Sequence, residues 1–445
     1  MAQSLYGFTR GIVTLYVQQY NFSVQYQLPK GWLMEVGYIG SHGRNLLVEP
    51  SLNQALLVNS SSPETYNNAL IAANGKPGGV AITRNSNTNA TLRVPVPGFA
   101  PAGLNLVTNE GYSHYNGFIL ELNHAFAHGF QCKMDYTQSR STDNDSGPSG
   151  SDLDSFTNNQ LYSWSNRGVS DFNQPHRFVF TGLWNIPGPK KGWREVAAGN
   201  WGLSGVYTVQ SGFPFSLGST SGGGLAGLTG SVTVRANSTQ CAYLQTPGSV
   251  QQNLNSYIDP ACFSAVPNLP AGAVLSGLSP QQGPGGGSYT IGNNGTAGDP
   301  GTGSLFGASG RNILQGPGEQ RFDLALTKAF RIRPLGEAGN LMFRAEAFKV
   351  FNNAIFSNPQ ANISNSNFGH ILSTVDGTGR ILQLALKLAF WRLVGQAPPP
   401  GASAWRFRLP GCLIAQKKKP HAMRGVGLMK FYCNLSRRMT DRCRY

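Results

Sequence analysis

The chain has 445 residues, with 35 Lys and Arg against 20 Asp and Glu, which gives a net charge of +15. Residues 391–445 hold twelve of the basic residues and one acid, Asp441, so this tail carries +11 and the other 390 residues only +4. A folded nucleic-acid-binding body is therefore not expected. No run of 18 apolar residues occurs, which excludes a transmembrane helix. An aromatic content of 11% argues against a disordered chain.

The first recognisable element is a hairpin over residues 20–38. Residues 1–19 show no clear pattern and are interpreted as a broken N-terminal end. They lack the basic start, apolar core and cleavage site of a signal peptide, so we expect that the chain begins inside a longer one. Apolar residues alternate with polar ones on both sides of the turn Pro29-Lys30-Gly31, namely Tyr20, Phe22, Val24, Tyr26 and Leu28, then Trp32, Met34, Val36 and Tyr38.

Two more hairpins are predicted, each after a long polar stretch. The stretch over residues 41–112 leads to a hairpin that turns at His128-Gly129, and the stretch over 140–174 leads to one that turns within 187–200. The apolar positions of these hairpins are Phe118, Leu120, Leu122, Phe126, Phe130, Cys132, Met134 and Tyr136, then His176, Phe178, Phe180, Trp184, Trp201, Leu203, Tyr207 and Val209.

Three alternating segments follow a Gly-, Ser-, Pro- and Asn-rich stretch over residues 213–318. The last segment has the clearest period of two, which predicts an extended strand with two unlike faces. It covers eleven residues, 380–390, and roughly 9–11 residues let a tilted strand cross a bilayer. The apolar positions of the three segments are Phe322, Leu324, Leu326, Phe330 and Ile332, then Leu341, Phe343, Ala345 and Ala347, then Leu382, Leu384, Leu386, Leu388 and Phe390.

Some charged residues test this pattern. Lys328 is the exception on the apolar side of its segment. Arg344 and Glu346 lie two apart on one polar face, which favours an ion pair in a wet lumen, with a ligand path as the alternative.

Short and long connections alternate strictly along the chain. The short ones fall near Pro29, His128, Pro187 and Pro334, and the long ones cover residues 41–112, 140–174, 213–318 and 353–379. Outer-membrane barrels have short periplasmic turns and longer external loops. We therefore predict an all-β fold, an antiparallel transmembrane β-barrel with long external loops. About nine strands are expected, an odd number, which indicates part of a larger barrel because single-chain bacterial barrels have even counts. The expected division is 1–19, the barrel part 20–390, and a basic tail 391–445.

The sequence holds no recognisable catalytic or metal-binding pattern. There is no G-x-S-x-G elbow, and the run 283–287 lacks the Lys and Ser/Thr of a phosphate loop. Asp143-Asn144-Asp145 with Asp152 and Asp154 misses the Gly and terminal Glu of a calcium loop, so a solvated acidic loop is favoured. We predict no catalytic, cofactor-binding or metal-binding residue, and the chain is not expected to be an enzyme.

The six cysteines show no zinc-site spacing. Cys241 and Cys262 fall in one predicted external loop, where an oxidising compartment permits a disulfide, and the sequence leaves open whether they pair. The tail contains Lys417-Lys418-Lys419 and Arg437-Arg438 without apolar periodicity. It is interpreted as a disordered extension, and a shifted reading frame would explain its origin. The alternative is a segment that contacts nucleic acid or anionic lipid.

A set of phrases in family order over residues 17–390 resembles the C-terminal barrel region of TonB-dependent outer-membrane receptors, particularly the Oar-like group abundant in Acidobacteria. The phrases are VQQYNFSVQYQLPKGWLMEVGYIGSHGRNLL, VSDFNQPHRFVFTGLWNIP, GNWGLSGVYTVQSGFPFS, GRNILQGPGEQRFDLALTKAF, FRAEAFKVFNNAIFSNP and GRILQLALKLAF. The resemblance implies a barrel of about 22 strands with an N-terminal plug, and uptake of large or scarce ligands energised by TonB. The chain departs from that pattern in having no plug ahead of residue 17, fewer than half of the strands, and 55 residues beyond Phe390.

The expected function is therefore ligand recognition and uptake at the cell outer membrane by a barrel fragment that lacks the plug. The expected partners are membrane lipid, the TonB system by resemblance, and an extracellular ligand, with carbohydrate, siderophore and peptide all open. The alternatives are a surface-attached adhesive or structural β-protein without transport, and a non-functional truncated remnant.

Overall fold

A computed structural model describes most of the sheet and part of its connections. The described residues are 3–56, 64–66, 80–82, 89–96, 98–147, 166–219, 234–238, 241, 243–265, 274–276, 289–292, 302–303, 309–332, 339–375, 379–391, 413–414 and 426–434. Among these residues, no helix is long and apolar enough to cross a membrane.

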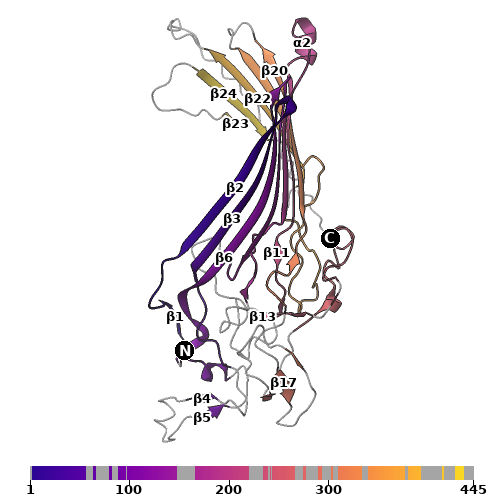
Figure 1. Cartoon of the computed structure of the whole chain (residues 1–445). Coiled ribbons are helices and arrows are strands. Elements are labelled where there is room, and N and C mark those ends of the chain that lie inside the picture. Colours follow the sequence, from indigo (N-terminus) through magenta and orange to yellow (C-terminus); the bar gives the residue numbers. More distant parts are fainter. Residues whose placement is uncertain are drawn as a thin grey trace, which may run out of the picture.

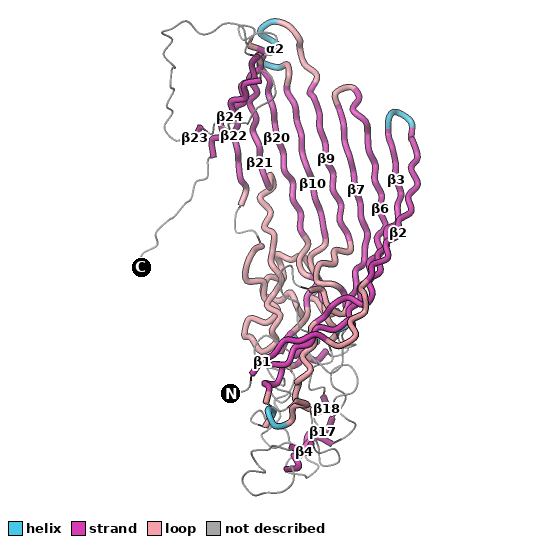
Figure 2. The backbone as a smooth tube through the Cα atoms, turned by 90° about the vertical axis from the view of Figure 1, so that its left-hand side faces the viewer, coloured by secondary structure: helices cyan, strands magenta, loops and turns pink. Residues whose placement is uncertain are grey.

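Nine long strands of the described residues form one twisted, open antiparallel sheet, in which each strand pairs with the next along the chain (Figures 1 and 2). For the predicted barrel part, this number and order agree with the nine strands expected, and four further strands bring the sheet of the described residues to thirteen. The strands are β2 Tyr16–Leu28, β3 Trp32–Val48, β6 Phe99–Ala127, β7 Phe130–Asp143, β9 His176–Ile186, β10 Trp201–Gln210, β20 Glu319–Arg331, β21 Asn340–Phe348 and β22 Ile381–Trp391.

The remaining elements lie mainly in the connections and are mostly short, except for a nine-residue strand near the C-terminus that is as long as β21. They are β1 Gln3–Phe8, η1 Pro29–Gly31, β4 Glu64–Tyr66, β5 Val80–Ile82, η2 Ala90–Leu92, β8 Gly168–Val169, α2 Gly192–Ala198, β11 Pro214–Phe215, β12 Gly218–Ser219, β13 Val234–Arg235, β14 Asn237–Ser238, η5 Pro260–Cys262, β15 Phe263–Ser264, β16 Val274–Ser276, β17 Tyr289–Gly292, β18 Thr302–Gly303, β19 Leu314–Gln315, β23 Leu413–Ile414 and β24 Val426–Asn434.

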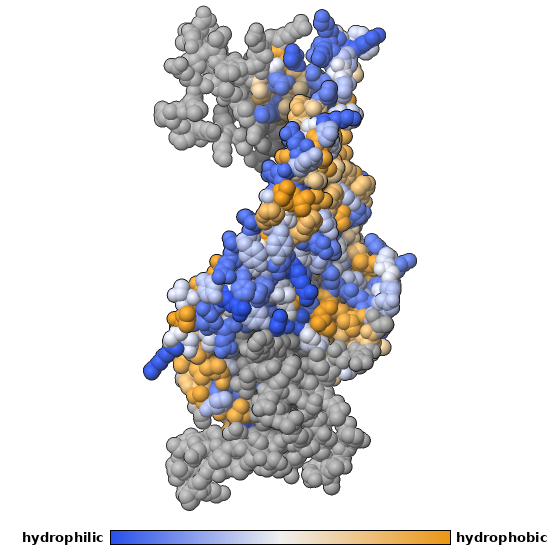
Figure 3. Space-filling model, viewed as in Figure 1, coloured by the Kyte–Doolittle hydropathy of each residue, from blue (hydrophilic) through white to orange (hydrophobic). Residues whose placement is uncertain are grey.

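The strand register places the apolar positions on one face of the sheet. One row across seven strands joins Tyr26, Met34, Leu122, Met134, Phe180, Tyr207 and Phe322. The adjacent row on the other face joins Gln25, Glu35, Glu121, Asp135, Val179, Thr208 and Arg321. The two faces are therefore called the apolar face and the polar face. Hydrophobic residues gather over the middle of the sheet in Figure 3.

Side chains of the apolar face remain exposed. Leu382 is 56% exposed and Leu384 and Leu386 are each 39% exposed. In a soluble sandwich these leucines would be buried against a second layer. Their exposure and the alternating register instead agree with a wall whose apolar face meets lipid and whose polar face meets water.

Aromatic residues mark both ends of the apolar face. Tyr20, Tyr38 and Tyr136 lie toward the long connections, whereas Trp32, Trp184 and Trp201 lie toward the short turns. Along β3, Trp32 and Tyr38 are six residues apart, which corresponds to about 20 Å of strand. Aromatic residues at both ends of an apolar band are typical of the interfacial girdles of outer-membrane barrels.

Two of the predicted short turns are confirmed by their backbone. Lys30 and Gly31 have φ of 62° and 80°, and His128 and Gly129 have φ of 52° and 84°. Two successive positive φ values match the twist of the strands that such a hairpin joins. The connection over 187–200 instead contains the helix α2, and 333–338 lies outside the described residues.

The strands at the long-connection end extend farther than predicted. β3 continues to Val48 and the 29-residue β6 begins at Phe99, both inside the stretch predicted as a loop over 41–112. The apolar-polar alternation fades there because both faces of the sheet meet water, so the pattern gives no signal for pairing that the backbone still makes.

The two ends of the chain also differ from the expectation. β1 lies within residues 1–19 and pairs in parallel with β6, and β2 begins at Tyr16. Within the expected disordered tail, β24 pairs antiparallel with β22, whose edge offers unpaired backbone groups, and β23 pairs with β24. Lys417-Lys418-Lys419 and Arg437-Arg438 lie outside the described residues.

The two-faced sheet predicts unequal effects of a charge at neighbouring positions of β22. Leu384→Arg, on the apolar face, should lower the free energy of unfolding by roughly 2–4 kcal/mol near the bilayer centre. Gln383→Arg, on the polar face, should cost much less because water solvates the new charge. Urea unfolding of the full chain in lipid vesicles, followed by tryptophan fluorescence, measures both. Equal effects of the two variants would contradict the assignment of the faces.

Candidate functional site: the external loop layer

The described parts of the four long connections gather at the end of the sheet opposite α2 (Figures 1 and 2). We call them the external loop layer, comprising residues 49–56 and 89–107, 144–147 and 166–175, 211–219 with 234–265 and 309–318 where described, and 349–375. Long connections lie outside the cell in outer-membrane barrels. This layer is therefore the part of the chain that meets external molecules first.

The layer has a hydrophobic core of its own. It is formed by Phe215, Leu217, Ala236, Ile258, Cys262, Phe263 and Leu314, all buried, with Ile363 and Phe368 packed against them. Cys262 forms a disulfide with Cys241 across a sequence separation of 21 residues. The pairing that the sequence left open is thus present, and it cross-links the edge of this core. Residues 213–318 were predicted only as a large loop, so this folded core was missed.

Backbone hydrogen bonds join the connection over 213–318 to the one over 353–379. The Gly218 N–H donates to the Ala361 carbonyl at 3.0 Å, and the Ile363 N–H donates to the Gly218 carbonyl at 2.9 Å. The Tyr257 N–H donates to Gly369 at 2.9 Å. Two connections that are separate in sequence therefore fold as one unit.

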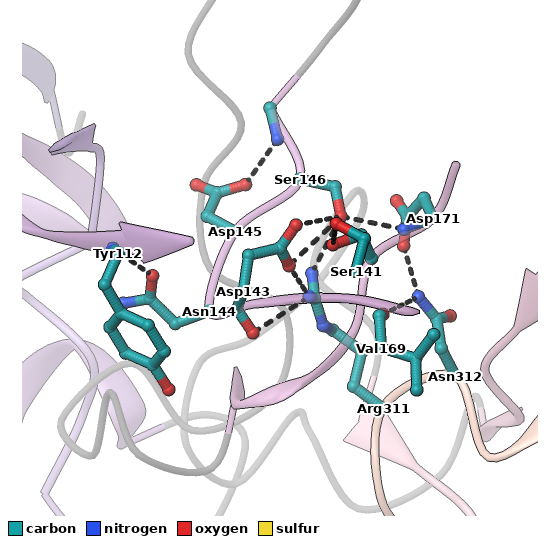
Figure 4. A network of polar contacts seen from close by, with 12 residues as sticks. Tyr112, Ser141, Asp143, Asn144, Asp145, Ser146, Val169, Asp171, Arg311 and Asn312 are labelled. Carbon is teal, nitrogen blue, oxygen red and sulfur yellow. Dashed lines mark hydrogen bonds and ion pairs between the residues drawn. The ribbon is translucent and has the colours of Figure 1, made fainter. Parts of the chain in front are cut away.

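A buried ion pair joins the connection over 140–174 to the same unit. The Arg311 guanidinium contacts the Asp143 carboxylate, with side chains 8% and 3% exposed, and its Nη2 also donates to the Asp143 carbonyl at 3.2 Å (Figure 4). The Ser146 hydroxyl donates to both Asp143 carboxylate oxygens at 3.0 and 3.2 Å. These contacts satisfy the carboxylate on several sides, as a buried charge requires.

Asn312 extends this network. Its Nδ2 donates to the Val169 carbonyl at 2.7 Å and to Asp171 Oδ1 at 2.5 Å (Figure 4). Its backbone N–H donates to Ser216 Oγ at 2.9 Å. Residues from three separate stretches of the chain therefore share one polar cluster. The cluster holds them in a single arrangement.

Burial changes the acidity of the two most buried arginines of the layer. It lowers the pKa of Arg311 to about 10, against a smaller opposite effect of Tyr112. Burial also lowers the pKa of Arg93 to about 10; the Arg93 Nε donates to Asn89 Oδ1 at 2.8 Å, and its Nη1 donates to the Leu56 carbonyl. Both guanidinium groups stay charged at neutral pH, so each keeps its hydrogen bonds within the layer at that pH.

The acidic triplet proves to be structural. Asp143 is buried in the ion pair, and the Asn144 amide accepts from the Tyr112 N–H at 3.0 Å and donates to the Glu110 carbonyl at 2.9 Å. The expectation of a solvated acidic loop was therefore wrong for these two residues. Asp152 and Asp154 lie outside the described residues. Where the structure describes side chains, no group of His, Cys, Asp and Glu could hold a metal ion.

The polar face of the sheet carries paired charges below the layer. Lys133 Nζ lies 3.0 Å from Glu121 Oε2 and 2.7 Å from Asp135 Oδ1. Arg344 Nη2 lies 2.5 Å from Glu346 Oε1, which confirms the predicted ion pair. The polar face of the sheet therefore carries ion pairs between the loop layer and the short turns.

The two-faced sheet and the sorted connections define a wall of the outer-membrane β-barrel class. The chain belongs to the family described as the outer membrane beta barrel domain, whose model matches residues 1–383. Its place is therefore the cell outer membrane.

A comparison with solved structures found a likeness to the outer membrane transporter YddB from Escherichia coli. The two share 8% sequence identity with a TM-score of 0.39, over 86% of this chain and 34% of the transporter. The chain thus spans about a third of the length of that protein. The search of curated proteins gave no match.

Removal of the disulfide should loosen the loop layer. Replacing Cys241 and Cys262 by Ser opens a loop of 21 residues, and the chain-entropy account gives a loss of about 3 kcal/mol. Thermal unfolding with and without reductant, together with proteolysis of the external surface, measures this loss. Reductant should lower the stability of the parent chain but not of the double variant. An equal response of both would contradict a structural role.

Breaking the buried ion pair should cost more than removing it whole. Arg311→Ala leaves the Asp143 carboxylate buried without its cation, which costs about 3–5 kcal/mol. A paired variant, Arg311→Met with Asp143→Leu, should recover much of this loss. Urea unfolding of the single and paired variants gives the coupling energy between the two sites. Strictly additive losses would show that the two side chains do not act as a pair.

Proposed function

We propose that the wall and the external loop layer recognise and take up a ligand at the outer membrane, as part of a TonB-dependent receptor of the Oar-like kind. The observation that supports this most is the cross-linked loop layer above a sheet with an apolar and a polar face. Such a layer presents a fixed surface outside the cell, and the charged polar face below it offers a wet route inward.

Preorganisation is the physical advantage of this arrangement. Ordering a mobile side chain on binding costs about 0.5–1.5 kcal/mol. The disulfide core and the Arg311–Asp143 pair remove part of this cost before the ligand arrives. The proposal assigns the chain no catalytic residue and no cofactor. Carbohydrate, siderophore and peptide remain candidate ligands, and the TonB system is the proposed energy source.

A surface-attached adhesive protein is the second candidate. One observation favours it: the loop layer has its own core around Leu217 and Ile258, so its external surface does not depend on a transport path. The exposed Leu384 and Leu386 weigh against the soluble form of this candidate, because a soluble β-protein would bury them.

Growth of a gene-deletion strain distinguishes the two candidates. On media where one polysaccharide, ferric siderophore or peptide is limiting, loss of the gene should slow growth on one of the three. The parent gene should restore growth, and a protonophore should abolish the restored uptake. Normal growth and uptake on all three, with a defect in surface attachment alone, would replace transport with adhesion.

A further inference from the structure

Lys328 is a buried lysine on the otherwise apolar face of the sheet. Lys328 shares its parity with Leu324, Leu326 and Phe330, yet it is only 2% exposed. Its Nζ donates to the Gly199 carbonyl and, at 3.2 Å, to the Glu195 carbonyl. It also lies 5.2 Å from the Trp201 ring centroid and 5.3 Å from that of Phe330. The charge is therefore satisfied by backbone oxygens at the C-terminal end of α2, where the helix dipole favours a cation.

Trp201 makes a second attachment between the same elements. It lies opposite Lys328 in the register, so it shares the apolar face, and its Nε1 donates to the Ala197 carbonyl at 3.0 Å. Both contacts come from the apolar face. They fix α2 over the lipid-facing side of the sheet, at the short-turn end (Figure 1).

The outer side of α2 and the two residues before it, Lys190 and Lys191, are exposed and carry positive charge. Trp193 is 76% exposed and Val196 is 61% exposed, although both are large apolar side chains. Lys190, Lys191 and Arg194 are exposed beside them, and the Arg194 guanidinium lies 5.7 Å from the Trp193 ring centroid. The Glu195 carboxylate is turned toward Asn200, whose Nδ2 donates to it at 3.3 Å. Figure 3 shows hydrophilic residues at this end of the sheet, next to the hydrophobic stretch over the strands.

We propose that residues 190–196 form a docking surface for anionic phospholipid headgroups in the periplasmic leaflet of the outer membrane. An exposed Trp with cations beside it is typical of a segment that lies in a membrane interface. Three cations close to one acid complement an anionic surface, and each basic residue near such a surface contributes about fivefold in affinity. The surface is continuous with the lipid-facing wall, because Lys328 and Trp201 tie it there.

The fluorescence emission of Trp193 measures whether this surface contacts lipid. The full chain is reconstituted in phosphatidylcholine vesicles with or without phosphatidylglycerol, and Trp193 emission is obtained as the difference from Trp193→Phe. With phosphatidylglycerol, this emission should shift to the blue and be quenched by lipid brominated near the headgroup. The triple variant K190Q/K191Q/R194Q should lose the quenching. Its affinity for dansyl-phosphatidylglycerol in detergent should fall on the order of a hundredfold.

Lys30→Gln is the matched control, because it removes an exposed cation at the same end of the sheet but in the β2–β3 turn. It should leave the Trp193 signal unchanged. Unquenched Trp193 in the anionic vesicles would overturn the proposal. So would equal quenching with and without phosphatidylglycerol and in the triple variant, since the contact would then be apolar only. The readout uses no transported ligand, so its result is independent of the uptake proposal.

Discussion

Hydrocarbon provides no hydrogen-bond partner for a peptide group, and this constraint shapes the whole wall. Every backbone N–H and C=O at membrane depth must be paired within the protein. Nearest-neighbour antiparallel pairing from β2 to β22 satisfies the backbone between these strands with short turns at one end, and among the described residues it leaves the outer edge of β2 without a partner strand. Once the backbone is satisfied in this way, side chains alternate between lipid and water, and the period of two becomes the sequence signal for the fold.

The wall was predictable for that reason. The alternation from Leu382 to Leu388 fixes both the strand and its lipid-facing side, and the register of β21 and β22 agrees with it position by position. The extensions of β3 and β6 beyond the membrane were not predictable in the same way. Water meets both faces there, so the composition of the strands no longer alternates.

The contacts of the loop layer could not be predicted from the sequence, because the residues that make them are far apart along the chain. Asp143 and Arg311 are 168 positions apart, and Phe215 and Leu314 meet from opposite ends of one long connection. No local period links such residues, since their contact depends on the sheet having formed first. The two cysteines in one connection were a clue to this layer, and at the opposite end of the sheet Lys328, which breaks an apolar pattern, was a clue to the attachment of α2. Both features mark tertiary contacts in the structure.

The unusual length of β6 sets how far the external loop layer lies from the membrane-spanning part of the sheet. About eleven of its 29 residues are enough to cross a bilayer. The remaining residues, about 18, pair with β3 and, in parallel, with β1, and they correspond to roughly 60 Å of strand beyond the apolar belt. Phe99 begins this strand, and its carbonyl accepts a hydrogen bond from Asn53 Nδ2. Both residues therefore lie far above the lipid headgroups. An approaching molecule is met well before it touches the membrane.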